Sequence, residues 1–130
     1  MNTRKYHRGY KRMVQPFDQL SDAALIEVAN VLMDKLMLAS TNRDYVAHTQ
    51  DFSKRALSVL NFDQFEMICE HYQKRQGYFL EREFVALFRR PNSIAVIWRQ
   101  KYSLVEGDYV AEMAMIIENN AYKVDHVFVF

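Results

Sequence analysis

Residues 78–130 read YFLEREFVALFRR, PN, SIAVIWRQKYS, LVEG, DYVAEMAMIIE, NN and AYKVDHVFVF. Four segments of this stretch are rich in Phe, Tyr, Val and Ile, which suit a half-buried pleated surface. Turn-forming residues separate them. We therefore expect four β-strands at 78–90, 93–103, 108–118 and 121–130. Because only a few residues join each strand to the next, the strands are predicted to form an antiparallel meander ordered as in the sequence.

The last turn and the alternation of side chains predict which residues share a face of this sheet. Asn119-Asn120 suits a two-residue turn with positive φ. Such a turn fixes the pairing of the two strands: paired residues have numbers with the same sum as 119 and 120. Met113 is therefore expected opposite His126. Side chains alternate along a strand, so one side should be mostly apolar. We expect that side to carry Leu80, Phe84, Phe88, Ile94, Val96, Trp98, Tyr109, Met113, Met115, Ile117, Tyr122, Val124, Phe128 and Phe130, with Arg82, Gln100 and His126 as its polar members.

The residues before Gly77 predict helices that cover one face of the sheet. Apolar residues recur at helical spacing after Ser21, which can cap a helix, and again between Asn61, which opens a capping-box pattern, and Gly77. A short helix is expected within 43–52, whereas 53–60 fits no single element. The chain is therefore predicted to have an α+β fold, with N-terminal helices packed on one face of a curved four-stranded antiparallel meander sheet.

Composition is that of a globular protein with one domain. Half of the 130 residues are apolar and a quarter are charged, as in ordinary soluble domains. No apolar run is long enough for a membrane span, no secretory signal is recognised, and the single cysteine, Cys69, excludes an internal disulfide. No metal-ligand spacing and no glycine-rich phosphate loop occur either. We expect a cytoplasmic protein with no metal, no cofactor and no membrane contact.

The N-terminus is basic although the net charge is only +1. Residues 1–15 contain five of the 17 Lys and Arg residues and no acid, which leaves 12 basic against 16 acidic residues in the remainder. We expect 1–15 to be a mobile basic arm and 16–130 to be a single domain. Tyrosines lie among these basic residues, a pattern that can also contact phosphates. Because the remainder predicts no matching basic surface, nucleic acid is not expected as a partner.

Three helices followed by a long meander, with Gly77 at the step from helix to strand, resemble the nuclear transport factor 2-like superfamily. The last hairpin matches the closing pattern of that family in Gly107-Asp108-Tyr109-Val110, in Glu118 and in Ala121-Tyr122-Lys123-Val124. The resemblance covers residues 20–130 and implies a cone-shaped, cystatin-like α+β fold. The family includes isomerases, dehydratases and polyketide cyclases, and also non-enzymatic binding or dimerising modules. Its enzymes usually have additional strands among the helices, where this chain has only residues 41–60.

Five residues are predicted to line a ligand-binding cavity on the mostly apolar side of the sheet. His126 could serve as an acid–base group or hold a polar group of a ligand, or it could be a core histidine satisfied by one hydrogen bond. Arg82 could clamp a carboxylate or pair with an acid on a helix. Trp98 and Met113 fit either an apolar pocket or a packed core, and Tyr72 could reach the same space from the third helix. A small apolar or anionic ligand is expected.

Two further groups of side chains are weaker candidates for chemistry. Asp44, Tyr45 and His48 lie one turn apart on the short helix and could gather an acid and a base, although exposed helices carry such triplets routinely. Cys69 lies on the buried stripe of its helix, so it is not predicted to be a nucleophile.

The opposite side of the sheet mixes charges with apolar residues that a monomer would leave in water. Large exposed apolar patches are typical of interaction sites, and a twofold dimer uses the same patch on both subunits. We therefore predict a homodimer packed sheet to sheet. Its expected interface contains Val85, Leu87, Ile97, Ile116, Val127 and Val129.

These observations leave two hypotheses for function. The first is a non-enzymatic homodimerising module that binds a small ligand or a partner protein through the concave face of the sheet. The second is a small pocket enzyme of the isomerase, dehydratase or cyclase type, with His126 as its acid–base group. Whether the cavity is open and polar at its base, or is instead filled by side chains, would discriminate between these hypotheses.

Overall fold

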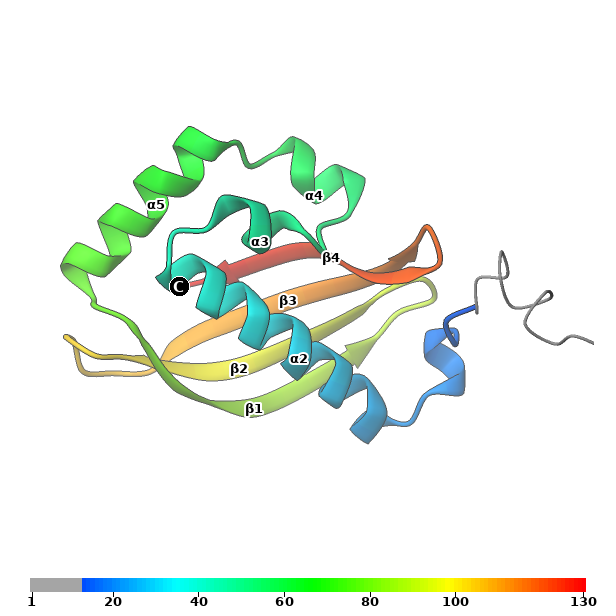
Figure 1. Cartoon of the computed structure of the whole chain (residues 1–130). Helices are drawn as coiled ribbons and strands as arrows, with labels where there is room; N and C mark the ends of the chain where they lie inside the picture. The colour runs from blue at the N-terminus through cyan, green and yellow to red at the C-terminus, as the bar shows by residue number, and fades with distance from the viewer. Residues whose placement is uncertain (1–12) are drawn as a thin grey trace, which may run out of the picture.

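Helices precede a four-stranded sheet in the computed structural model, which describes residues 13–130. The elements are η1 (Phe17–Gln19), α2 (Asp22–Thr41), α3 (Tyr45–Thr49), α4 (Lys54–Ser58), α5 (Phe62–Arg75), β1 (Phe79–Arg89), β2 (Ile94–Tyr102), β3 (Tyr109–Glu118) and β4 (Ala121–Val129). The strands form one antiparallel sheet in the order β1-β2-β3-β4. α2 crosses one face of the curved sheet, and α4 and α5 lie beyond its β4 edge (Figure 1). The predicted α+β fold is confirmed.

Side-chain caps begin the helices where the sequence predicts them. Ser21 accepts a hydrogen bond from the backbone N–H of Ala24, and Asn61 and Gln64 form a complete capping box. Residues 53–60, which fitted no single element, contain α4, and its N-cap is Ser53. Because each cap satisfies a backbone N–H that has no partner within the helix, it fixes the residue at which that helix starts.

The linker between α3 and α4 is bonded to the edge of β4. The N–H of Val124 donates to the carbonyl of Asp51 at 2.7 Å, and the N–H of Ser53 donates to the carbonyl of Val124 at 2.8 Å. Phe52, which lies between these two residues, forms a parallel bridge with Val124. The helical half of the chain is therefore joined to its last strand by backbone hydrogen bonds.

The predicted turn between β3 and β4 is confirmed, but the register that it sets does not persist. Asn119 and Asn120 have φ angles of 51° and 55°, as a primed two-residue turn requires. The predicted pairing holds as far as Met115 opposite Val124. The next pair is Ala114 with His126, so Asp125 is an extra residue in β4. It forms a β-bulge, which reverses the faces of all the β4 residues that follow.

The bulge corrects three of the predicted site residues in β4. Val127 and Val129 face the helices and pack against the core, so they do not belong to the outer face of the sheet, which is the face turned away from the helices. His126 pairs with Ala114 instead of Met113 and is exposed. Phe128 and Phe130 are more than half exposed, and they stack on each other with ring centroids 5.4 Å apart.

A second bulge reverses β1 in the same way. Phe84 pairs with Trp98, but the next pair is Ala86 with Ile97, which leaves Val85 as the extra residue. Leu87, predicted to lie in a dimer interface, consequently faces the helices and packs against the core. Phe88, predicted to be inside, is 52% exposed on the outer face. In the central strands β2 and β3 the predicted alternation is correct throughout.

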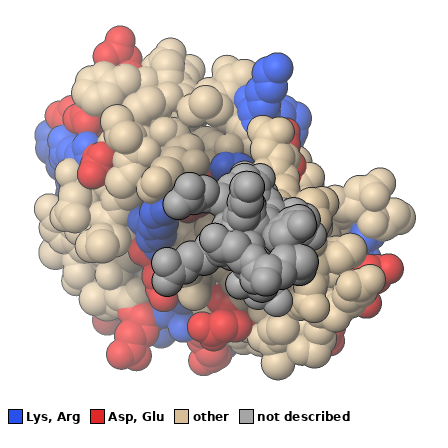
Figure 2. Space-filling model, turned by 45° about the vertical axis from the view of Figure 1, so that its right-hand side comes forward, with Lys and Arg blue, Asp and Glu red and all other residues tan. Residues whose placement is uncertain are grey.

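The predicted N-terminal arm of residues 1–15 lies mostly outside the described residues. Within its last part, the N–H of Val14 donates to the side-chain oxygen of Asn120 at 2.8 Å. The Tyr122 hydroxyl donates to the carbonyl of Gln15 at 2.7 Å. On the face shown in Figure 2, basic and acidic side chains form small mixed groups with broad uncharged areas between them.

Gly77 should tolerate a side chain far less well than Gly107, although both have positive φ, of +88° and +105°. A Cβ on Gly77 would overlap the Ser103 hydroxyl and lie 2.8 Å from Cγ of Leu104, whereas a Cβ on Gly107 would meet nothing within 4 Å. We expect Gly77→Ala to lower the free energy of unfolding by about 2–4 kcal/mol, because overpacking adds to the backbone strain. Gly107→Ala should cost about 1–2 kcal/mol. Urea unfolding measures both, and equal losses would show that the Ser103 contact is not limiting.

Candidate functional site

A cavity of about 600 Å³ lies between the helices and the last strand. Sites for small ligands typically measure roughly 300–1,000 Å³. The apolar part of its lining comes from several elements and includes Met33, Leu36, Phe52, Phe65, Val127 and Val129. The bulge in β4 is what turns the two valines toward this space. The concave side of the sheet is therefore only partly filled by side chains.

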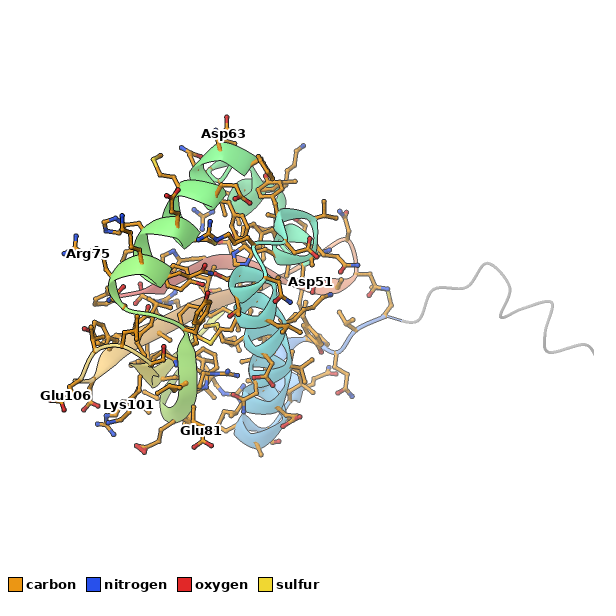
Figure 3. The ribbon with its side chains drawn as sticks, turned by 60° about the vertical axis from the view of Figure 1, so that its left-hand side comes forward. Asp51, Asp63, Arg75, Glu81, Lys101 and Glu106 are labelled. Carbon is orange, nitrogen blue, oxygen red and sulfur yellow. The ribbon has the colours of Figure 1, made fainter. Side chains whose placement is uncertain are left out.

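The position of α5 leaves the cavity open on one side. Phe65 and Tyr72 are buried on the face of α5 that packs toward α2 and α3. Ile68, on another face of the same helix, lines the cavity and is still 55% exposed. Figure 3 shows α5 standing over the sheet, with Asp63 and Arg75 near its two ends and pointing away from the molecule. α5 thus forms one side of the opening.

One end of the cavity carries a closed hydrogen-bond network. The hydroxyls of Ser40 and Tyr72 are 2.7 Å apart, and the Gln73 amide donates to the Tyr72 oxygen at 3.3 Å. Sγ of Cys69 lies 3.6 Å from Oγ of Ser40. Burial raises the pKa of both the Tyr72 hydroxyl and the Cys69 thiol, since it disfavours the charged forms. These groups are therefore neutral at pH 7 and already have partners.

His48 on α3 also lines the cavity, and its protonation state follows from its contacts. Nδ1 lies 3.2 Å from the carbonyl of Leu36. A carbonyl can only accept, so Nδ1 carries the proton. Burial lowers the pKa of His48, and the ring is therefore neutral at pH 7. Nε2 then holds a free electron pair, and within residues 13–130 this atom has no hydrogen-bond partner.

A second polar group of the lining is the hydroxyl of Tyr102 on β2. Burial, with smaller contributions from Tyr72 and Tyr109, raises its pKa to about 12. It therefore stays protonated and can donate a hydrogen bond at any physiological pH. In the described part of the chain it has no hydrogen-bond partner. Two interior groups, His48 and Tyr102, are thus neutral and available to a ligand.

Ion pairs occur at the opening of the cavity instead of its interior. The Arg55 guanidinium lies 2.6 Å from Oδ2 of Asp125, and the Ser53 hydroxyl donates to Oδ1 of the same carboxylate at 2.7 Å. Hydrogen bonding by Arg55 lowers the pKa of Asp125, which is consequently ionised at pH 7. These contacts hold the extra residue of β4 against the start of α4.

Three of the predicted cavity residues lie elsewhere. Trp98 and Met113 are each 1% exposed and belong to the packed core. The Arg82 guanidinium binds Asp34 at 2.7 Å and the carbonyl of Asn30 at 3.1 Å, and it lies 5.2 Å from the Trp98 ring centre. Arg82 is thus engaged with α2, and none of the three contributes to the lining of the cavity. Trp98 and Met113 are thus packed-core residues, and Arg82 pairs with an acid on a helix, as the alternative interpretations of these residues predicted.

The other two predicted residues do lie at the cavity, but in different positions. Tyr72 is part of the interior network. His126 reaches only the opening, because its Nε2 lies 2.9 Å from Oε1 of Glu112, a residue of the outer face. Its exposure contradicts both a core histidine and an interior acid–base group.

Of the triplet Asp44, Tyr45 and His48, a weak candidate in the sequence, only His48 lines the cavity. Asp44 is the N-cap of α3, and the Tyr45 hydroxyl donates to the carbonyl of Leu60 at 2.6 Å. The triplet therefore does not form an acid–base group. Tyr102 and Ser40 could not be selected from the sequence, since nothing local distinguishes them from other residues of a strand and a helix.

Two kinds of site are absent from the described residues. No group of three or more His, Cys, Asp or Glu side chains within 13–130 could hold a metal ion. None of the helices formed by these residues is long and apolar enough to cross a membrane.

Comparison with solved structures finds this arrangement of helices and sheet in other proteins. A SEC-C motif containing protein from Rhodopseudomonas palustris superposes with a TM-score of 0.55 at 10% identity, over 75% of this chain and 74% of that one. A putative calcium/calmodulin-dependent protein kinase type II association domain from Thiobacillus denitrificans gives 0.54 at 8% identity, over 77% of this chain and 91% of that one. Both have nuclear transport factor 2-like folds. The likeness is one of fold alone.

The sequence itself has no recognised relative in two further comparisons. No protein-family model matches it, and no curated protein matches it.

Proposed function

We propose that this chain is a non-enzymatic module of the nuclear transport factor 2-like superfamily that forms homodimers and binds a small ligand in the cavity. The order of its elements and the likeness to two structures of that fold support the superfamily. The observation that carries ligand binding is the open cavity of about 600 Å³, with an apolar lining and a few interior polar groups.

The ligand is proposed to be neutral and mostly apolar. The interior polar groups (Ser40, His48, Cys69, Tyr72 and Tyr102) are all uncharged at pH 7. Burying a charged group without an opposite charge is costly. Arg82, once expected to hold an anion, is bound to Asp34 and does not line this space. These features favour an uncharged ligand over an anionic one.

Narrowing the opening should weaken binding of an uncharged apolar fluorophore such as N-phenyl-1-naphthylamine. Ile68→Trp adds bulk at the opening, and we expect it to raise the Kd about tenfold or more, or to abolish saturable binding. Leu38→Trp is the matched control, since Leu38 is 64% exposed on α2 and does not line the cavity. Fluorescence titration measures both. Binding that Ile68→Trp leaves unchanged would contradict the site.

The outer face of the sheet supports the homodimer, with a corrected set of residues. Its exposed or half-buried apolar side chains are Phe88, Ala95, Ile97, Ala114, Ile116 and Phe128. Neighbouring charged side chains already have partners on the same face: Arg99 and Glu83 pair at 2.7 Å, and the Glu112 carboxylate lies 2.9 Å from Nε2 of His126. A partner would therefore cover apolar surface without leaving these charges unpaired.

Charged substitutions on this outer face should dissociate the dimer. Ile97→Asp and Phe128→Asp each place an uncompensated carboxylate in the proposed contact, so we expect the dimer Kd to rise at least tenfold. Leu38→Asp is the control on the helical side. Sedimentation velocity over a concentration series measures the change. The proposal fails if the unsubstituted protein remains a monomer at about 0.5 mM, or if both variants dimerise as it does.

A further inference from the structure

His48 lines the cavity, and its Nε2 is a hydrogen-bond acceptor with no partner among residues 13–130. The ring is held on its other side, where Nδ1 donates to the carbonyl of Leu36 at 3.2 Å. The ring contacts Phe52 in a T-shaped arrangement and Phe65 in a tilted one, with ring centroids 5.4 and 4.7 Å away. The ring therefore cannot turn over without losing the hydrogen bond to Leu36, and the contacts with Phe52 and Phe65 limit its other movements. The orientation of Nε2 is fixed before any ligand arrives.

The other interior polar groups are less available as acceptors. The Ser40 and Tyr72 hydroxyls bond each other at 2.7 Å, and the Tyr72 oxygen also accepts from Gln73. The Tyr102 hydroxyl has no partner among the described residues. It can donate its proton, but as an acceptor a phenol oxygen is weaker than a neutral imidazole nitrogen. His48 is thus the group that a ligand must satisfy when it displaces water.

We propose that the ligand of this cavity carries a hydroxyl group that donates a hydrogen bond to Nε2 of His48, and that its class is therefore a neutral apolar alcohol or phenol. The inference rests on the proposed function, since it names the chemistry of the same ligand. A pure hydrocarbon would remove water from Nε2 and give nothing in return, whereas a hydroxyl replaces the lost hydrogen bond. Sites built to hydrogen-bond a hydroxyl reject analogues that lack it.

The preference for a hydroxyl should be measured where His48 is neutral. Burial lowers the pKa of His48 from its ordinary value of 6.5, so Nε2 is an acceptor at about pH 7.5, whereas a protonated Nε2 would instead donate to the hydroxyl oxygen. The other titratable groups that line the cavity are Arg55 on α4, Cys69, His71 and Tyr72 on α5, Tyr102 on β2, and Asp125 and His126 on β4. Because His71 and His126 also line the cavity, only a variant of His48 isolates its part.

The test uses pairs of probes that differ only in the hydroxyl: 1-naphthol with naphthalene, and 4-ethylphenol with ethylbenzene. Their Kd values are measured by equilibrium dialysis at about pH 7.5. We expect the Kd of the hydroxylated member of each pair to be lower by about tenfold or more. The wild-type protein suffices for this experiment, so it does not depend on a variant that folds.

Three variants assign the effect to one atom. His48→Phe keeps an aromatic ring beside Phe52 and Phe65 but has no acceptor, and should bind both members of a pair equally. His48→Gln places an amide near the position of Nε2 and should restore part of the preference. Tyr102→Phe should keep the full preference.

The outcomes separate this inference from the proposed function. If neither member of either pair binds, ligand binding in the cavity fails and the inference fails with it. If both members bind equally well to the wild type, the cavity binds apolar molecules but the assignment to His48 is wrong. A preference that survives in His48→Phe and is lost in Tyr102→Phe would likewise overturn it, because the acceptor would then be Tyr102.

Discussion

Trp98→Ala is expected to lower the free energy of unfolding by about 3–5 kcal/mol, the range for removal of a large aromatic side chain from a core. Trp98 is 1% exposed, and its indole N–H donates to the side-chain oxygen of Asn30 at 3.0 Å. The Arg82 guanidinium lies over the same ring. The substitution would therefore leave a cavity and remove one contact each from Asn30 and Arg82, which keep their bond to each other. Urea unfolding followed by far-UV circular dichroism measures the change.

Trp98→Phe is the control for this prediction. It keeps most of the aromatic volume and the surface on which Arg82 packs, but it removes the hydrogen bond to Asn30. We expect a loss of about 1–2 kcal/mol, mainly from the smaller ring and the lost hydrogen bond. If the two variants were equally unstable, the hydrogen bond would matter more than the packing, and Trp98 would not stabilise the core chiefly through its volume.

Deletion of Asp125 is expected to be comparably damaging, at about 3–6 kcal/mol, although it removes a partly exposed residue at the edge of the sheet. Without the extra residue, the pairing set by the Asn119-Asn120 turn would continue along β4. Val127 and Val129, which are both partly buried, would then turn to the solvent, and each would lose part of the roughly 1.5–3 kcal/mol that full burial of a valine is worth. His126 would turn toward the core in their place. Chemical unfolding of the deletion variant gives the loss.

Asp125→Asn is the matched control, because it keeps the residue count and an acceptor for the Ser53 hydroxyl. The Arg55 side chain of its ion pair is 65% exposed, and pairs with an exposed partner contribute little. We therefore expect Asp125→Asn to be much closer to the wild type than the deletion is. A deletion variant as stable as Asp125→Asn would mean that β4 does not depend on the bulge for its register.

The helices and central strands were predictable because their signals are local. Ser21 and Asn61 cap helices with neighbouring N–H groups, and β2 and β3 alternate without interruption, so that Val96, Trp98 and Met113 were correctly placed on the inner face. Each of these features depends on residues within a few positions along the chain.

The faces of the edge strands were not predictable, and the reason is visible in their sequences. Residues 84–88 read FVALF and residues 127–130 read VFVF. Both runs are apolar at odd and even positions, so hydrophobic alternation fits either register equally well. What decides the register in β4 is the contact of Asp125 with Ser53 and Arg55, about 70 residues earlier. No local pattern reports such a contact.

The candidate site was only partly predictable for a related reason. Tyr72 was found because helical periodicity directs it inward. His48 and Tyr102 become site residues only because α5 packs on α2 and α3 and stays clear of β4. That arrangement is a property of the assembled helices, whereas Trp98 and Met113 fill the space in front of the central strands.

The bond between the α3–α4 linker and β4 also bears on how this chain acquires its structure. The Asp51 carbonyl and the Ser53 N–H find their backbone partner in Val124, in the last strand of the sheet. A ribosome makes that strand well after the helices, so the nascent helices have no sheet edge on which to settle while synthesis of the meander continues. Contacts between segments so distant in sequence slow folding and make it depend on the complete sheet. Helix and sheet should consequently form together, in one step that follows the synthesis of β4.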